Sequence, residues 1–136
     1  MIRSIAGVIV GLVVGFAVVM LMDAVSHAVY PPPSGFDFSN PEAVKGLLAK
    51  APVGALLVVS VGWLLAPMAG GFAAAKIAGR SAWVHAGIVG ALLFIATIGN
   101  LLMIPHPTWL WAPGVLFPPF GTLVAARLAR SRRVEQ

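Results

Sequence analysis

The sequence contains no cysteine and very little charge. Of its 136 residues, 9 are Lys or Arg and 4 are Asp or Glu. Only 10% are charged, against about 25% in an ordinary soluble domain. The lack of cysteine excludes a disulfide framework and a thiolate metal site. The scarcity of charge, together with 60% hydrophobic residues, excludes a soluble globular domain and a disordered chain.

Long uncharged runs are the main feature that is present. A membrane-spanning helix needs about 20 apolar residues, and Ile5 to Met22 and Ala51 to Ala75 approach or exceed that length. The chain from Ser81 to Ala126 has no Lys, Arg, Asp or Glu and is about twice too long for one crossing. Because dense prolines end helices, Pro105 and Pro107 divide it. The sequence predicts a single membrane domain, an all-α four-helix bundle with spans at about 4–29, 52–78, 81–104 and 109–128.

A secretory signal peptide is the alternative interpretation of the first run. Arg3 precedes the run, and the small residues from Ser26 to Ala28 fit a cleavage site loosely. The apolar stretch is longer than the usual length of about 7 to 15 residues. We therefore expect the first run to remain as a span.

Basic residues are distributed unequally between the two sides of this bundle. One side holds seven of the nine Lys and Arg, and the other holds only Lys45 and Lys50. The positive-inside rule then predicts an up-down-up-down protein of a bacterial inner membrane with both termini cytoplasmic. The arginines after the last span are expected to attract anionic lipid, and no nucleic-acid partner is expected despite a pI of about 10.9. These arginines are Arg127, Arg130, Arg132 and Arg133.

The first loop contains the signals of a short helix. Asn40, Pro41 and Glu42 are typical of a helix start, with an N-cap, a proline at the first position and an acid in the first turn. Apolar residues between Val44 and Ala51 recur on one face. They predict an interfacial helix at about 41–50 that covers the end of the bundle, with docking of a partner as the alternative.

Small residues mark the expected helix contacts, since close packing at such residues drives association in lipid. The expected contact residues are Gly7, Gly11 and Gly15 on the first span and Gly71, Ala75 and Gly79 on the second. The alternative is that the glycine face pairs two copies of the chain. The segments Ala6 to Gly11 and Ala86 to Gly90 also resemble each other weakly, which suggests a 2+2 parallel hairpin repeat.

Polar groups at membrane depth are few, and such groups are candidates for function. Asp23 and His27 lie four residues apart, hence on one helical face, and Tyr30 follows three residues later. Asn100 and His106 lie at a comparable depth near the third loop. If the hairpins pack side by side, we expect these five residues to converge beneath the first loop.

Three chemistries fit such a cluster. The favoured one is a hydrogen-bonded latch, in which Asp23 orients His27 or accepts from Tyr30. The second is proton or cation handling, because an Asp paired with a His can relay protons. The third and least favoured is a metal site with His27, His106 and Asp23 as ligands. No resident cofactor is expected.

Motifs of the common enzyme classes are missing. The sequence has no G-x-S-x-G, no H-E-x-x-H and no phosphate-binding loop. We therefore expect a non-enzymatic accessory or scaffold protein that acts through helix–helix contacts, with a second copy or another membrane protein as partner. The alternatives are a small proton- or cation-coupled transporter and a divalent metal site that faces the periplasm.

The four-span plan resembles the small multidrug resistance transporters. Those proteins carry an essential Glu deep in the first span, whereas Ile5 to Met22 contains no acid, so their activity is not implied. Two other segments, Asp23 to Pro33, which contains HAVYPPP, and Asn100 to Trp111, which contains NLLMIPHPTW, are similar to those of uncharacterised small four-span bacterial inner-membrane proteins. That resemblance covers nearly the whole chain and implies bacterial origin and topology, without implying an activity.

Overall fold

The computed structural model describes residues 1–131, and helices are the only regular structure within that range. The long helices are α1 (Ile2–Val29), α3 (Val53–Ala78), α4 (Ala82–Met103) and α5 (Trp111–Ser131), and the short elements are α2 (Pro41–Lys50) and the 3-10 turn η1 (Thr108–Leu110). Four helical segments are long and apolar enough to cross a membrane. The all-α bundle is thereby confirmed, and the chain is a small multi-pass membrane protein.

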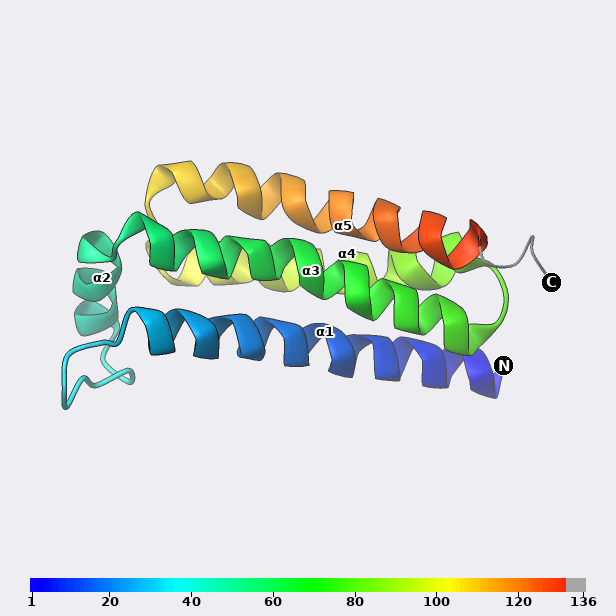
Figure 1. The fold of residues 1–136 in the computed structure, drawn as a ribbon, viewed down its shortest axis with the longest axis horizontal. Coiled ribbons are helices and arrows are strands. Elements are labelled where there is room, and N and C mark those ends of the chain that lie inside the picture. The colour runs from blue at the N-terminus through cyan, green and yellow to red at the C-terminus, as the bar shows by residue number, and fades with distance from the viewer. Residues whose placement is uncertain (132–136) are drawn as a thin grey trace.

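The four long helices run side by side with alternating direction, and α2 crosses one end of the bundle (Figure 1). Helix α3 is central, because it packs against α1, α4 and α5. Helix α1 packs along α3 and touches α4 only slightly, so it forms an edge of the bundle. The N-terminus and the end of α5 lie at the end opposite α2 (Figure 1).

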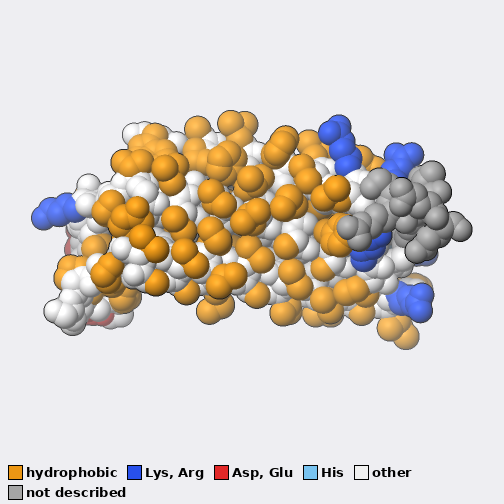
Figure 2. Space-filling view, in the orientation of Figure 1, with side chains coloured by type: hydrophobic (Ala, Val, Ile, Leu, Met, Phe, Trp, Pro, Cys, Tyr) orange, Lys and Arg blue, Asp and Glu red, His pale blue; other side chains and the backbone are white. Residues whose placement is uncertain are grey.

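On the face that Figure 2 shows, charged side chains gather at the two ends of the molecule, with an apolar band between them. The end away from α2, here called the arginine end, carries Arg3, Lys76, Arg80, Arg127 and Arg130. The loop and helix at the other end carry Asp37, Glu42, Lys45 and Lys50. Arg132 and Arg133, which were expected to attract lipid, lie outside the described residues.

Helix α2 forms where the N-cap signal predicts it. The Asn40 side chain accepts hydrogen bonds from the backbone N–H groups of Glu42 at 3.0 Å and Ala43 at 3.3 Å. On its inner face, Leu48 packs against a buried cluster that includes Trp63. Glu42 is exposed to solvent on the other side. Helix α2 therefore covers the end of the bundle, as expected.

Glycines of α1 let its backbone touch the backbone of α3. A Cβ atom added at Gly11 would lie 2.6 Å from the carbonyl oxygen of Gly70, and one added at Gly7 would lie 2.7 Å from that of Ala74. Real Cβ atoms do not approach so closely. The third glycine, Gly15, meets the side chain of Leu93 on α4. The first span thus uses its three glycines for contacts within one copy of the chain.

The face of α3 that meets α1 is not the predicted one. It contains small residues at intervals of four, namely Ala66, Gly70, Ala74 and Ala78. Gly71 faces α4 and α5 instead, where an added Cβ would lie 3.2 Å from the Cβ of Ala125. Ala75 is buried among alanines of α4 and α5, and Gly79 ends α3 in the left-handed region with φ of 67°. Successive helical residues differ by about 100°, so a shift of one position turns the contact to another neighbour.

The two hairpins do not pack equivalently. In the weak repeat Gly7 corresponds to Gly87, yet Gly7 touches the backbone of α3 whereas an added Cβ at Gly87 would meet open space. The close contact between α4 and α5 occurs at Gly90, against Thr122. The parallel repeat therefore stays a prediction from the sequence.

We expect the substitution Gly11→Ala to lower the melting temperature of the purified protein in detergent. The added methyl group would clash with the Gly70 carbonyl, and overpacking of this kind costs about 1–3 kcal/mol. The matched control is Gly87→Ala, which adds the same atom to open space and removes backbone freedom worth up to about 1 kcal/mol. Equal melting temperatures for the two variants would contradict the α1–α3 contact.

Candidate functional site: a lateral cleft between three helices

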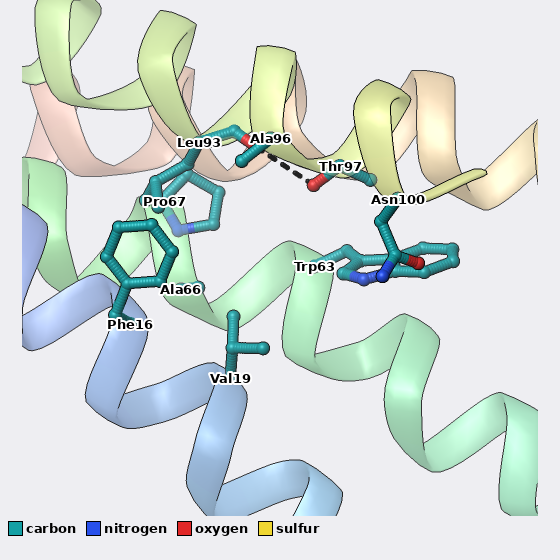
Figure 3. Close-up of a pocket in the computed structure, with 9 residues that line it drawn as sticks. All are labelled: Phe16, Val19, Trp63, Ala66, Pro67, Leu93, Ala96, Thr97 and Asn100. Carbon is teal, nitrogen blue, oxygen red and sulfur yellow. Dashed lines mark hydrogen bonds between the residues drawn. The ribbon is translucent and has the colours of Figure 1, made fainter. Parts of the chain in front are cut away.

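A cleft of about 140 Å³ lies between α1, α3 and α4 (Figure 3). It is lined by Phe16, Val19, Trp63, Ala66, Pro67, Leu93, Ala96, Thr97 and Asn100. The contact of Gly15 with Leu93 closes the gap between α1 and α4. Toward α2 the larger residues Phe16, Val19 and Trp63 line the gap, and α1 and α4 no longer close on one another.

The two polar side chains of the cleft, Thr97 and Asn100, differ in whether they have a partner. The Thr97 hydroxyl donates to the carbonyl oxygen of Leu93, one turn earlier, at 2.9 Å. The carboxamide of Asn100 is exposed and makes no hydrogen bond with any other part of residues 1–131. In Figure 3 it lies beside the indole of Trp63. An amide in apolar surroundings is costly without a hydrogen-bond partner, so the carboxamide of Asn100 is free to bond to a group outside the chain.

Asp23 and His27 continue the cleft face of α1 toward α2. Asp23 is half-buried and lies one turn beyond Val19, on the same side of the helix. His27 lies one further turn along and is near enough to interact electrostatically with Asp23. The imidazole of His27 packs edge-on against Phe38 of the first loop, with ring centroids 5.7 Å apart. The histidine therefore fastens the loop through an aromatic contact, in place of the expected hydrogen bond.

Tyr30 and His106 have other neighbours. The hydroxyl of Tyr30 lies against Gly54, in the first turn of α3. Nδ1 of His106 lies 2.7 Å from the carbonyl oxygen of Ile104. Since a carbonyl only accepts, this nitrogen carries the proton. The His106 ring packs edge-on against Trp63 at 6.2 Å, so His106 contacts the cleft only through that indole.

The expected convergence of five residues is therefore only partial. Asp23 and His27 lie together, and Asn100 lines the cleft that their face of α1 adjoins. Across residues 1–131, no three His, Asp or Glu side chains gather closely enough to hold a metal ion. The hypothesis that His27, His106 and Asp23 form a metal site thus has no support in the geometry.

The remaining buried polar side chains have structural partners. The Ser26 hydroxyl donates to the carbonyl oxygen of Ala55 at 3.2 Å and ties α1 to α3. The Ser60 hydroxyl donates to the carbonyl oxygen of Leu57 at 2.8 Å within its own helix. His85 is buried, with Nδ1 3.1 Å from the carbonyl oxygen of Ser81, just before α4. These hydrogen bonds account for polar residues inside an apolar bundle.

Of the residues that line the cleft, only Asn100 was predicted as a site residue from the sequence. Thr97 precedes Asn100 by three positions, which places both on one helical face, and this spacing was a usable signal. Trp63 is a buried core residue that also forms the floor of the cleft. The sequence could not have identified Phe16 as a lining residue, because an apolar side chain in a membrane span is equally compatible with facing lipid or facing protein.

Comparison with known proteins finds no matching family model, no matching curated protein and no matching solved structure.

A short turn in the first loop presents Phe38 to His27. On one side of Phe38, the carboxylate of Asp37 accepts two hydrogen bonds from Ser39, one from its N–H at 2.9 Å and one from its hydroxyl at 2.6 Å. These bonds favour the charged carboxylate and lower the pKa of Asp37 below its ordinary value. The turn that places Phe38 is therefore held by an ionised Asp37.

We expect the backbone amide of Ser39 to report this ionisation by NMR. A lowered pKa in the folded chain means that the turn is fully stabilised above the ordinary pKa and loses that stabilisation as the pH falls through the lowered value. The Ser39 amide shift should titrate with a midpoint below about 3.9, and Asp37→Asn should abolish the titration. A midpoint above that value would show that the turn does not favour the carboxylate.

Proposed function

We propose that the protein is a non-enzymatic membrane scaffold or accessory protein that acts through contacts between transmembrane helices. The observation that carries the proposal is the exposed carboxamide of Asn100, which has no hydrogen-bond partner within residues 1–131 and lies in an apolar helix. Polar side chains in spans associate helices by hydrogen bonding across them. A neighbouring helix that enters the cleft would give Asn100 its partner.

A second copy of the chain is the partner that this surface fits best. A carboxamide both donates and accepts, so two Asn100 side chains related by twofold symmetry satisfy each other. Twofold contacts that use the same surface on both copies are the commonest form of self-association. The apolar walls of the cleft, from Phe16, Val19 and Ala96, add van der Waals contact around the pair.

We also propose the membrane and the orientation. The charge distribution of the bundle supports a bacterial inner membrane with the arginine end in the cytoplasm, since short cytoplasmic segments are rich in Lys and Arg. Arg127 and Arg130, both exposed at the end of α5, would then face the anionic inner leaflet, where each basic residue contributes about 1 kcal/mol.

Photocrosslinking in the intact membrane tests the scaffold. A photoreactive residue at position 96, which lines the cleft, should give a crosslinked product of twice the mass of the chain. Asn100→Leu should reduce its yield about three- to twentyfold, because a hydrogen bond between spans is worth about 0.6 to 1.7 kcal/mol. The matched control is position 95, which is exposed at the same depth but does not line the cleft.

Each outcome of that experiment is decisive. A product of twice the mass from position 96, weakened by Asn100→Leu and absent from position 95, supports the self-associating scaffold. A product of another mass with the same pattern keeps the scaffold and replaces the second copy by a different membrane protein. Equal yields from positions 95 and 96 would overturn the proposal. So would a yield from position 96 that is the same in the wild type and in Asn100→Leu.

The second candidate is a small proton- or cation-coupled transporter. Asp23 favours it, because this acid is half-buried in a span, interacts with His27 and adjoins the cleft. Intramembrane acids commonly mark ion pathways.

Liposomes that contain the purified protein and a pH-sensitive dye separate the two candidates. A transporter should dissipate a pH gradient when a monovalent cation is added, and Asp23→Asn should slow the flux to that of protein-free liposomes. A scaffold leaves the wild type, Asp23→Asn and protein-free samples indistinguishable.

A further inference from the structure

A second cavity lies at the end of the bundle that α2 covers, and we call it the α2 pocket. It has a volume of about 340 Å³ and is formed by the end of α1, the start of α3 and the last turn of α2. Its walls are mainly apolar, with Val29, Pro31, Pro32 and Leu47 among them. It is separate from the lateral cleft, because the two share no lining residue.

The ionisable groups of the α2 pocket that can carry positive charge are Lys50 and His27, and no carboxylate lines it. Lys50 ends α2, and its ammonium group forms no ion pair with any acid in residues 1–131. Asp23, the acid that interacts with His27, lies one turn deeper along α1 and is not part of the wall. The pocket therefore offers uncompensated positive charge beside an apolar surface.

Tyr30 adds a neutral donor to the same wall. Its hydroxyl lies at the first turn of α3, and its ring lines the pocket. The other hydroxyl of the wall, that of Ser26, already donates to Ala55. A ligand would thus meet the Lys50 ammonium group, the Tyr30 phenol and the His27 imidazole as possible donors, with mainly apolar residues on the remaining sides.

This combination selects an amphipathic anion. The pocket lies at the end of the bundle, where α1 and α3 meet the last turn of α2. The ends of membrane-spanning helices lie at the depth of lipid headgroups. A free inorganic anion would be attracted by the ammonium group of Lys50, but it would lose its hydration against the apolar walls. A lipid phosphate carries aliphatic groups that these walls would cover. We propose that the α2 pocket binds the phosphate group of an anionic phospholipid, with Lys50 as its counter-ion and Tyr30 as a hydrogen-bond donor.

Native mass spectrometry of the detergent-purified chain tests this site with phosphatidylglycerol as the probe. Lys50→Gln should reduce retention of one bound lipid about fivefold, since one Lys near the membrane surface contributes about 1 kcal/mol. The matched control is Lys45→Gln, which removes the same charge from the same helix at a position that does not line the pocket. Lys50→Arg keeps the positive charge and should retain the lipid, and a melting temperature of Lys50→Gln equal to that of the wild type shows that this variant folds.

The outcomes distinguish the lipid from its alternatives. Retention that depends on Lys50 and survives Lys45→Gln supports the proposal. Equal losses in the two glutamine variants, or no loss in either, would mean adventitious surface lipid and would overturn it. Displacement of the lipid by millimolar inorganic phosphate would also overturn it, in favour of a site for the free anion. The test does not involve Asn100, so its result is independent of the proposed scaffold.

Discussion

The contact between the backbones of α1 and α3 is the constraint on which the rest of the molecule depends. In lipid, helices gain nothing by hiding apolar side chains from one another, so association relies on close approach and van der Waals contact. Helix α1 has almost no other support, because it touches α4 only slightly. The contact of Gly11 with Gly70 brings the backbones of α1 and α3 so close that neither position has room for a Cβ atom. Without that approach α1 would be held mainly by the Ser26 hydrogen bond and by the first loop.

The lateral cleft follows from where the small residues stop. In the half of the bundle near the arginine end, glycine and alanine line both α1 and α3, and the helices close tightly. Nearer α2, α3 still contacts α1, as Gly62 does against Met22, but α4 no longer reaches α1 beyond Leu93. The larger side chains Phe16, Val19 and Trp63 therefore border the space in which Asn100 is exposed.

Much of the fold is readable in the sequence because its signals are local. Charge-free runs indicate helices, and Asn40 followed by Pro41 indicates the start of α2, whatever the rest of the chain does. The rotation of each helix about its own axis, in contrast, is not determined by local signals. Helix α3 carries small residues on two faces, so Gly70 and Gly71 are equally plausible contacts until the positions of α1, α4 and α5 are known.

The candidate site shows the same division between local and non-local information. The spacing of Asp23 and His27 along one helix fixed their proximity in advance. The position of His106 against Trp63 depends on how the third loop folds over α3, and no periodicity carries that information. Side chains on separate helices meet only after packing has set the rotation and depth of each helix.

The unequal lengths of the helices give the two hairpins different relations to the bilayer. Helices α1 and α3 have 28 and 26 residues, or about 42 and 39 Å, whereas α4 and α5 have 22 and 21, or about 33 and 32 Å. A hydrocarbon core about 30 Å thick matches the second hairpin and is too thin for the first. The first hairpin must tilt or project, as hydrophobic mismatch requires. Membrane thickness thereby sets how deep Asp23 and His27 lie relative to the headgroups, and a thicker bilayer would fit the first hairpin better and the second hairpin worse.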